Sequence, residues 1–148
     1  MIFVTVGTTD FDDLICMIDQ ISGELNEKVI AQIGRGNYIP DHMEYFRFAS
    51  SLDCYIHQAR IVICHGGLGT VIEALEKGAK VIGVSNPDRY DLHQEEILRV
   101  FAERGHLTWC SQLSTLPNIL QEIENRTFVP YEKPRCSIAK KIKEFLDS

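Results

Sequence analysis

The chain has 148 residues, of which 45% are hydrophobic and 24% charged, a composition typical of a soluble globular domain. A chain of this length buries roughly two thirds of the surface that its unfolded form exposes, so it can build a core without disulfides or a metal. The net charge of -6 and the lack of a Lys/Arg run count against nucleic acid as a ligand. No apolar stretch approaches the roughly 20 residues of a membrane span, so we expect a cytoplasmic protein.

Apolar, β-branched runs alternate with segments of helical periodicity along most of the chain. In chain order, the pattern predicts a strand over residues 2–6, a helix over 11–21, strands over 28–33 and 45–49, a helix over 51–58, a strand over 60–64, a helix over 70–77, a strand over 80–84, a helix over 91–104, a strand over 107–110 and a helix over 114–125. The predicted strands are apolar along their whole length and do not alternate between apolar and polar residues. They therefore predict an α/β fold, a Rossmann-like parallel sheet of about six strands with helices on both faces.

The last part of the chain differs from the rest. Pro130 and Pro134 punctuate it, which predicts an extended crossing segment from residue 127 onward. A terminal helix then carries Ile138, Ile142 and Phe145 on one face. We therefore divide the chain into a Rossmann-like domain, 1–126, and a C-terminal crossing segment and helix, 127–148, which we expect to act as a packing or docking arm.

Neither the cysteines nor the carboxylates of this chain indicate a metal site. The five cysteines form no C-x-x-C pair, so neither a disulfide framework nor a zinc site is indicated. Asp12 and Asp13 open a predicted helix, where they can stabilise the positive end of its dipole. A metal or catalytic role for this acidic pair is the weaker alternative, and we expect no metal requirement.

The strongest motif is the glycine-rich stretch that links the predicted strand 60–64 to the next helix. It reads His65-Gly66-Gly67-Leu68-Gly69-Thr70-Val71-Ile72-Glu73. Missing β-carbons let backbone N–H groups approach an anion, and the helix N-terminus adds partial positive charge. The stretch therefore predicts a diphosphate site, in which Thr70 donates to the same anion and Glu73 accepts from a ribose.

Two other interpretations of this stretch stay open. The glycines can form an ordinary tight turn, with Glu73 as a solvated or capping carboxylate, and a histidine at a strand end such as His65 often only satisfies a local hydrogen bond. A nicotinamide site is a weaker alternative because Ile72 replaces the third glycine of G-x-G-x-x-G. No Gly-Lys-Ser/Thr occurs, so the P-loop pattern is absent as well.

The stretch 48–73 resembles, without a gap, the donor-binding C-terminal domain of glycosyltransferase family 28. The opening Val4-Thr5-Val6-Gly7-Thr8-Thr9-Asp10-Phe11 is even more similar to the catalytic subunit of the two-part UDP-GlcNAc transferase of N-glycan assembly, and to bacterial capsule and exopolysaccharide subunits of the PssE type. The likeness covers residues 1 to about 107 and fades afterwards. It implies one half of a GT-B glycosyltransferase.

The resemblance implies a set of UDP-sugar contacts. Gly7, Thr8 and Thr9 would face the diphosphate, Gly34-Arg35-Gly36 would lie beside the nucleoside, and Ser51 and Leu52 would meet the uracil. His65, Gly66, Gly67, Gly69 and Thr70 would contact the diphosphate, Glu73 the ribose, and His93 and Gln94 the sugar hydroxyls. An acidic residue is usual before the glutamine, so His93 leaves the identity of the sugar open. His93 is a candidate for the general base because it would face the sugar, and a base supplied by a partner is the favoured alternative.

The implied function is that of the UDP-sugar-binding catalytic subunit of a two-component glycosyltransferase, which transfers a hexose or N-acetylhexosamine to a lipid-linked or polysaccharide acceptor. One Rossmann-like half leaves the acceptor side of such a cleft open. A membrane-associated acceptor-binding subunit would complete the cleft and recruit the chain to the cytoplasmic face of a membrane. The alternative is a non-catalytic nucleotide-sugar-binding or regulatory module. A sugar-nucleotide epimerase is weaker because it needs two fused halves.

Overall fold

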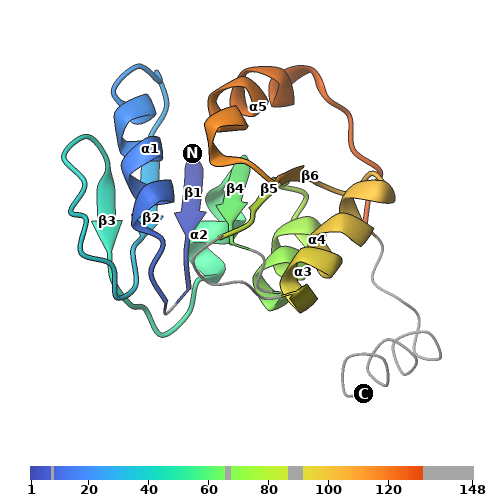
Figure 1. Cartoon of the computed structure of the whole chain (residues 1–148), viewed down its shortest axis with the longest axis horizontal. Helices are drawn as coiled ribbons and strands as arrows, with labels where there is room; N and C mark the ends of the chain where they lie inside the picture. Colours follow the sequence, from blue (N-terminus) through green and yellow to red (C-terminus); the bar gives the residue numbers. More distant parts are fainter. Residues whose placement is uncertain (8, 66–67, 87–91, 132–148) are drawn as a thin grey trace.

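The computed structural model describes residues 1–7, 9–65, 68–86 and 92–131, which form one parallel six-stranded sheet between two layers of helices (Figure 1). The strands are β1 (Ile2–Thr5), β2 (Val29–Gln32), β3 (Glu44–Phe46), β4 (Ile61–Cys64), β5 (Lys80–Val84) and β6 (Thr108–Cys110). Their order is β3-β2-β1-β4-β5-β6, and every neighbouring pair is parallel. This is the strand order of a Rossmann fold, so the predicted fold class is confirmed.

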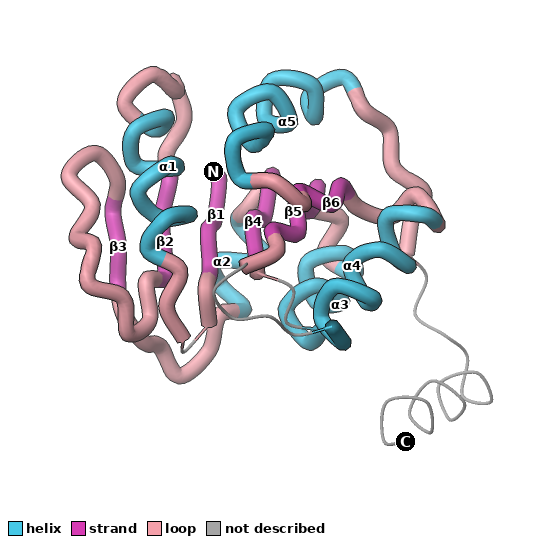
Figure 2. Tube along the Cα trace, viewed as in Figure 1, coloured by secondary structure: helices cyan, strands magenta, loops and turns pink. Residues whose placement is uncertain are grey.

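The described residues form five α-helices, of which four connect consecutive strands and the fifth follows β6 (Figure 2). They are α1 (Asp12–Ser22), α2 (Asp53–Gln58), α3 (Leu68–Glu76), α4 (Leu92–Glu103) and α5 (Leu116–Glu122), and 3-10 turns at Leu113–Thr115 and Ile123–Asn125 flank the last one. On one face of the sheet, α1 and α5 pack against strand residues such as Val4 and Ile63. On the other face, α2, α3 and α4 pack against alternate strand residues such as Phe3 and Val62. The apolar runs are continuous because both faces of each strand are covered.

Four predicted elements differ from the observed ones by more than one residue at an end. The helix predicted over 70–77 is α3, which begins two residues earlier, at Leu68. The strand predicted over 45–49 is β3, Glu44–Phe46, and the side chains of Phe48 and Ala49 are exposed. The helix predicted over 51–58 begins at Asp53, whose N–H donates to Ser51 Oγ at 3.2 Å. The helix predicted over 114–125 is α5 with a 3-10 turn at either end. Local hydrogen bonds at the ends of these elements override the periodicity.

The described part of the C-terminal segment, 127–131, contains neither helix nor strand. It runs from the end of α5 back to α4, as Figure 1 shows, and the N–H of Val129 donates to the Gly105 carbonyl at 2.9 Å. The Tyr131 ring contacts the rings of Phe101 and His106 edge-on. The terminal helix predicted from Ile138 onward lies outside the described residues.

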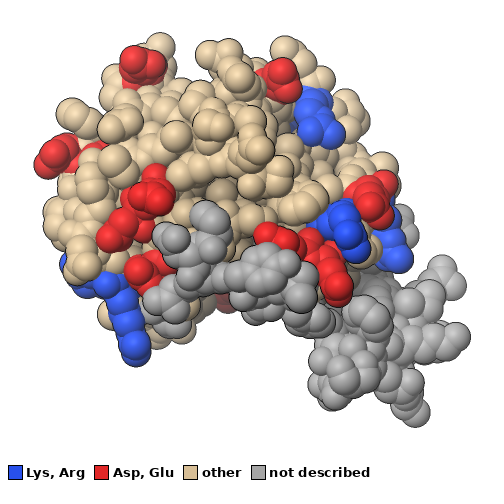
Figure 3. All heavy atoms as spheres, viewed as in Figure 1, with Lys and Arg blue, Asp and Glu red and all other residues tan. Residues whose placement is uncertain are grey.

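The surface of the described residues carries no broad basic patch on the face shown in Figure 3. None of the described helices is long and apolar enough to cross a bilayer.

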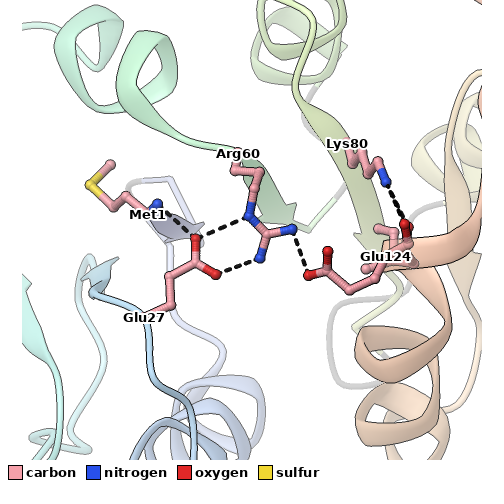
Figure 4. A network of polar contacts seen from close by, with 6 residues as sticks. Met1, Glu27, Arg60, Lys80 and Glu124 are labelled. Atoms are coloured by element: carbon pink, nitrogen blue, oxygen red, sulfur yellow. Dashed lines mark hydrogen bonds and ion pairs between the residues drawn. The ribbon is translucent and has the colours of Figure 1, made fainter.

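An ion-pair network ties the amino ends of the strands together (Figure 4). Glu27, before β2, accepts from the Met1 ammonium at 2.8 Å and from the Arg60 guanidinium at the start of β4. Arg60 also pairs with Glu124, whose backbone carbonyl accepts from Lys80 Nζ at 3.2 Å. The network joins the starts of four strands, β1, β2, β4 and β5, to the turn after α5, so it holds the edge of the sheet opposite the carboxyl ends.

Replacing Glu27 by Gln is expected to lower the free energy of unfolding by about 1–2 kcal/mol at pH 7. The hydrogen bond from Arg60 holds the pKa of Glu27 at about 2, below its ordinary 4.5. The stabilisation is therefore fully present above pH 4.5 and is lost as the pH falls toward 2. Urea denaturation of both proteins at pH 7, 4 and 2.5 measures it, with Glu24→Gln as the exposed control. An equal difference at all three pH values would contradict the assignment.

Candidate functional site

The sheet has one topological switch point, between β1 and β4 at its centre. After β1 the chain enters α1 on one face, and after β4 it enters α3 on the opposite face. The two loops therefore diverge at the carboxyl ends of neighbouring strands, which is where open α/β sheets bind their ligands. The predicted site residues Gly7, Thr9 and His65 belong to these two loops.

Gly7 and His65 lie against each other across the switch point. Gly7 has φ of +65°, and a methyl group on it would come 3.2 Å from His65 Cε1. The Gly7 N–H donates to Thr5 Oγ1 at 3.0 Å, and Thr5 Oγ1 donates to Gln32 Oε1 at 2.5 Å. Because its N–H is used inside the protein, Gly7 serves the site by its shape and by its lack of a side chain.

His65 provides a neutral donor at this position. Burial lowers the pKa of its imidazole, against a smaller opposing effect of the Thr5 backbone, so the ring is neutral at pH 7. Its Nδ1 is buried without a hydrogen-bond partner among the described residues. A neutral imidazole has one N–H and one acceptor nitrogen, and the N–H can donate either to the Thr5 backbone or to an anionic oxygen.

The N-terminus of α3 opens on the same edge, directly after β4. The positive end of its dipole and the N–H groups of its first turn, which have no acceptor within the helix, therefore lie at this edge. Gly69, in the first turn, is exposed, and a methyl group on it would meet nothing within 4 Å. Thr70 and Glu73 are half-buried on the same helix. Packing within the described protein gives no reason for a glycine at position 69.

The loop after β2 forms a compact turn, residues 34–37, which we call the Gly34 turn. Gly34 has φ of +58°. The Arg35 N–H donates to the Thr9 carbonyl at 2.9 Å. The turn is therefore joined to the loop between β1 and α1, which we call the β1 loop. The Asn37 N–H donates to both carboxylate oxygens of Asp12, at 3.1 and 3.2 Å. Asp12 thus lies in the first turn of α1, as predicted, and in addition it fixes a neighbouring loop.

The loop after β5 completes the edge. Asn86 Nδ2 donates to the Asp10 carbonyl at 3.3 Å, and the Trp109 indole donates to Ser85 Oγ at 2.8 Å. His93 and Gln94 lie in the first turn of α4, which follows, and their side chains are outside the described part.

The remaining predicted site residues lie at the same edge of the sheet or outside the described part of the chain. Ser51 is exposed and Leu52 half-buried just before α2, at the carboxyl side of β3. Thr8, Gly66 and Gly67 lie outside the described residues. The sequence analysis missed four supporting residues, namely Thr5, Gln32, Arg47 and Trp109. A polar residue inside an apolar strand, such as Thr5 or Gln32, is the signal that could have found two of them.

Comparison with known proteins identifies the family of this chain. The family model "Glycosyltransferase family 28 C-terminal domain" matches residues 1–148. This chain belongs to that family. The match extends to the last residue, farther than the resemblance predicted from the sequence, which faded after about residue 107.

Two curated relatives are named UDP-N-acetylglucosamine transferase subunit ALG13. The one from Homo sapiens is 36% identical over 123 residues, which cover 74% of this chain and 11% of the relative. The one from Yarrowia lipolytica is 30% identical over 122 residues, which cover 72% of this chain and 62% of the relative. This chain therefore matches only part of each relative's length.

Solved structures share the fold at low identity. The kitacinnamycin glycosyltransferase has a TM-score of 0.68 at 16% identity, covering 84% of this chain and 35% of that one. The solution NMR structure of ALG13 has a TM-score of 0.63 at 17% identity, covering 95% and 93%. The architecture is that of one half of a GT-B glycosyltransferase.

Proposed function

We propose that this chain is the UDP-sugar-binding catalytic subunit of a two-component glycosyltransferase. The transferred group would be a hexose or an N-acetylhexosamine, and the acceptor a lipid-linked or polysaccharide chain. Family membership supports the reaction class. The names of the relatives favour UDP-N-acetylglucosamine as the donor and support a partner subunit.

The observation that carries the proposal is the open space at Gly69. A glycine in a helix costs roughly 0.5–1 kcal/mol relative to alanine. No backbone strain or close contact among the described residues accounts for it here. An anion that must approach the backbone at the start of α3 does account for it.

In the proposed reaction the developing charge on the leaving diphosphate is stabilised by donors that are already in place. These are the free N–H groups at the start of α3 and the N–H of the neutral His65 imidazole. Glu73 would accept from the ribose hydroxyls, and the Gly34 turn would flank the nucleoside. Since these donors supply the electrostatic stabilisation, we propose that transfer needs no metal ion.

The second component would bind the acceptor and close the site against water. We propose a membrane-associated partner that docks on residues 127–148 and recruits the chain to the cytoplasmic face of a membrane. His93 is the candidate general base of this chain.

Calorimetric titration with UDP-GlcNAc, UDP-glucose, UDP-galactose and NAD tests the proposal. We expect UDP-GlcNAc to bind at least tenfold more tightly than NAD, with equal affinity in EDTA and in Mg²⁺, because the donors to the diphosphate are protein groups. Glu73→Gln should weaken UDP-GlcNAc binding several-fold, because the carboxylate would be lost from the ribose.

A different result would contradict each part of the proposal. Preference for NAD would overturn the donor class, and a strict Mg²⁺ requirement would overturn metal independence. Full transferase activity of the purified chain alone would contradict the two-component organisation. Donor binding without turnover in the presence of the partner would instead favour the non-catalytic module.

A further inference from the structure

Arg47 lies directly after β3, whereas the Gly34 turn follows β2. The Arg47 side chain nevertheless donates hydrogen bonds to two carbonyls of that turn. Its Nη1 donates to the Gly34 carbonyl at 3.1 Å and to the Gly36 carbonyl at 2.8 Å. A charged donor forms stronger hydrogen bonds to carbonyls than a neutral one. Arg47 therefore connects the edge strand β3 to the loop after β2.

These two bonds fix the orientation of two peptide planes. In a trans peptide, the C=O and the following N–H point in opposite directions. The Gly34 carbonyl faces Arg47 while the Arg35 N–H donates to the Thr9 carbonyl in the β1 loop. The peptide between Gly36 and Asn37 is arranged in the same way. Its carbonyl accepts from Arg47, and its N–H, that of Asn37, donates to the Asp12 carboxylate in the first turn of α1.

The Gly34 turn is therefore held between Arg47 on one side and two elements of the switch point on the other. There is no room for a side chain at Gly36, because a methyl group there would collide with Asp12 Oδ1. The exposed Arg35 side chain projects from this fixed turn at the carboxyl edge. Loss of the Arg47 bonds would leave both peptide planes held only through their N–H groups, and so would loosen the turn and its link to the β1 loop.

We propose that Arg47 is a positioning residue of the donor site, which holds the Gly34 turn and the β1 loop in the arrangement that accepts a nucleoside diphosphate. The inference rests on the proposed function. Arg47 acts through the turn, since its Nη1 is already occupied by the two carbonyls.

Arg47→Met tests the inference, with UDP as the probe. We expect UDP affinity by calorimetry to fall about tenfold, a change of ~1.4 kcal/mol. In the free protein, amide hydrogen exchange of Arg35 and Asn37 should accelerate at least several-fold, while Val62 in the central strand β4 stays unchanged. Arg47→Lys keeps the charge and a donor, so it should recover most of the affinity.

Arg99→Met is the matched control, because it removes the same charge from an exposed position on α4 and should leave both measurements unchanged. Arg47→Gln supplies a second variant with the same expected direction should the methionine variant not fold. Unchanged UDP affinity in folded Arg47→Met or Arg47→Gln protein would overturn the inference, and so would accelerated exchange that includes Val62. A wild-type chain that does not bind UDP would overturn the proposed function and this inference together.

Discussion

Gly69→Ala should make the protein more stable and make it bind UDP less tightly. The position is helical and open, so alanine lowers the entropy of the unfolded chain without a clash, and the free energy of unfolding should rise by about 0.4–1 kcal/mol. The same methyl group would stand where the diphosphate approaches the N-terminus of α3. UDP affinity should fall about tenfold for alanine and beyond a hundredfold for Gly69→Trp.

Gly23→Ala is the matched control for this experiment. Gly23 is exposed at the end of α1, has φ of -62°, and a methyl group on it would make only an ordinary contact, 3.9 Å from His42 Cγ. Its replacement should stabilise the fold to a similar extent and leave UDP binding unchanged. Urea denaturation and calorimetry on both variants measure the two effects. Undiminished UDP affinity in Gly69→Trp would remove the observation that carries the proposed function.

Asp19→Ala is expected to lower the free energy of unfolding by about 3 kcal/mol, the largest loss of stability that we predict. Asp19 is 1% exposed. Its carboxylate accepts from Tyr38 Oη at 2.7 Å, from the Asp41 N–H at 3.0 Å and from the His42 N–H at 2.8 Å. It thus holds the helix-free crossover between β2 and β3 against α1, and its removal leaves three donors without an acceptor.

The same carboxylate makes part of the stability dependent on pH. Burial alone would raise the pKa of Asp19, but the hydrogen bonds from Asp41, Tyr38 and His42 outweigh it and lower the pKa. A lowered folded-state pKa means that the stabilisation is complete above the unfolded-state value and is lost as the pH falls through the folded-state value. The stability difference between wild type and Asp19→Ala should therefore shrink below about pH 3.9. The exposed Asp13→Asn, on the same helix, should change stability by at most ~0.5 kcal/mol, and a comparable loss there would contradict a specific role for Asp19.

The sequence predicted the sheet because burial on both faces leaves a visible pattern. The strands around Ile63 and Ile82 are runs of apolar residues that end where the chain turns. These runs placed five of the six strands within one residue at either end, and they placed the end of β3 three residues too far along the chain. The pattern was least informative for β3, an edge strand whose neighbours Phe48 and Ala49 are exposed.

The contacts that support the candidate site could not be predicted from a local pattern in the sequence. Arg47 resembles an ordinary solvated charge at a strand end, and nothing local connects it to residues 34–36. Asp19 did leave a signal, because it follows Ile15 by four residues and precedes Ser22 by three on the buried face of α1. A carboxylate on an apolar helix face requires a partner, but the partner cannot be named from the helix alone.

By itself, the sequence determined the fold class, the family and the glycine-rich stretch at the start of α3, because these depend on residues that are neighbours along the chain. The tertiary structure alone decided the strand order, the contact of Gly7 with His65 and the clamp of Arg47 on the Gly34 turn. Each of these joins residues separated by more than ten positions. Such contacts form between chemically ordinary groups, so only the folded chain shows which of them meet.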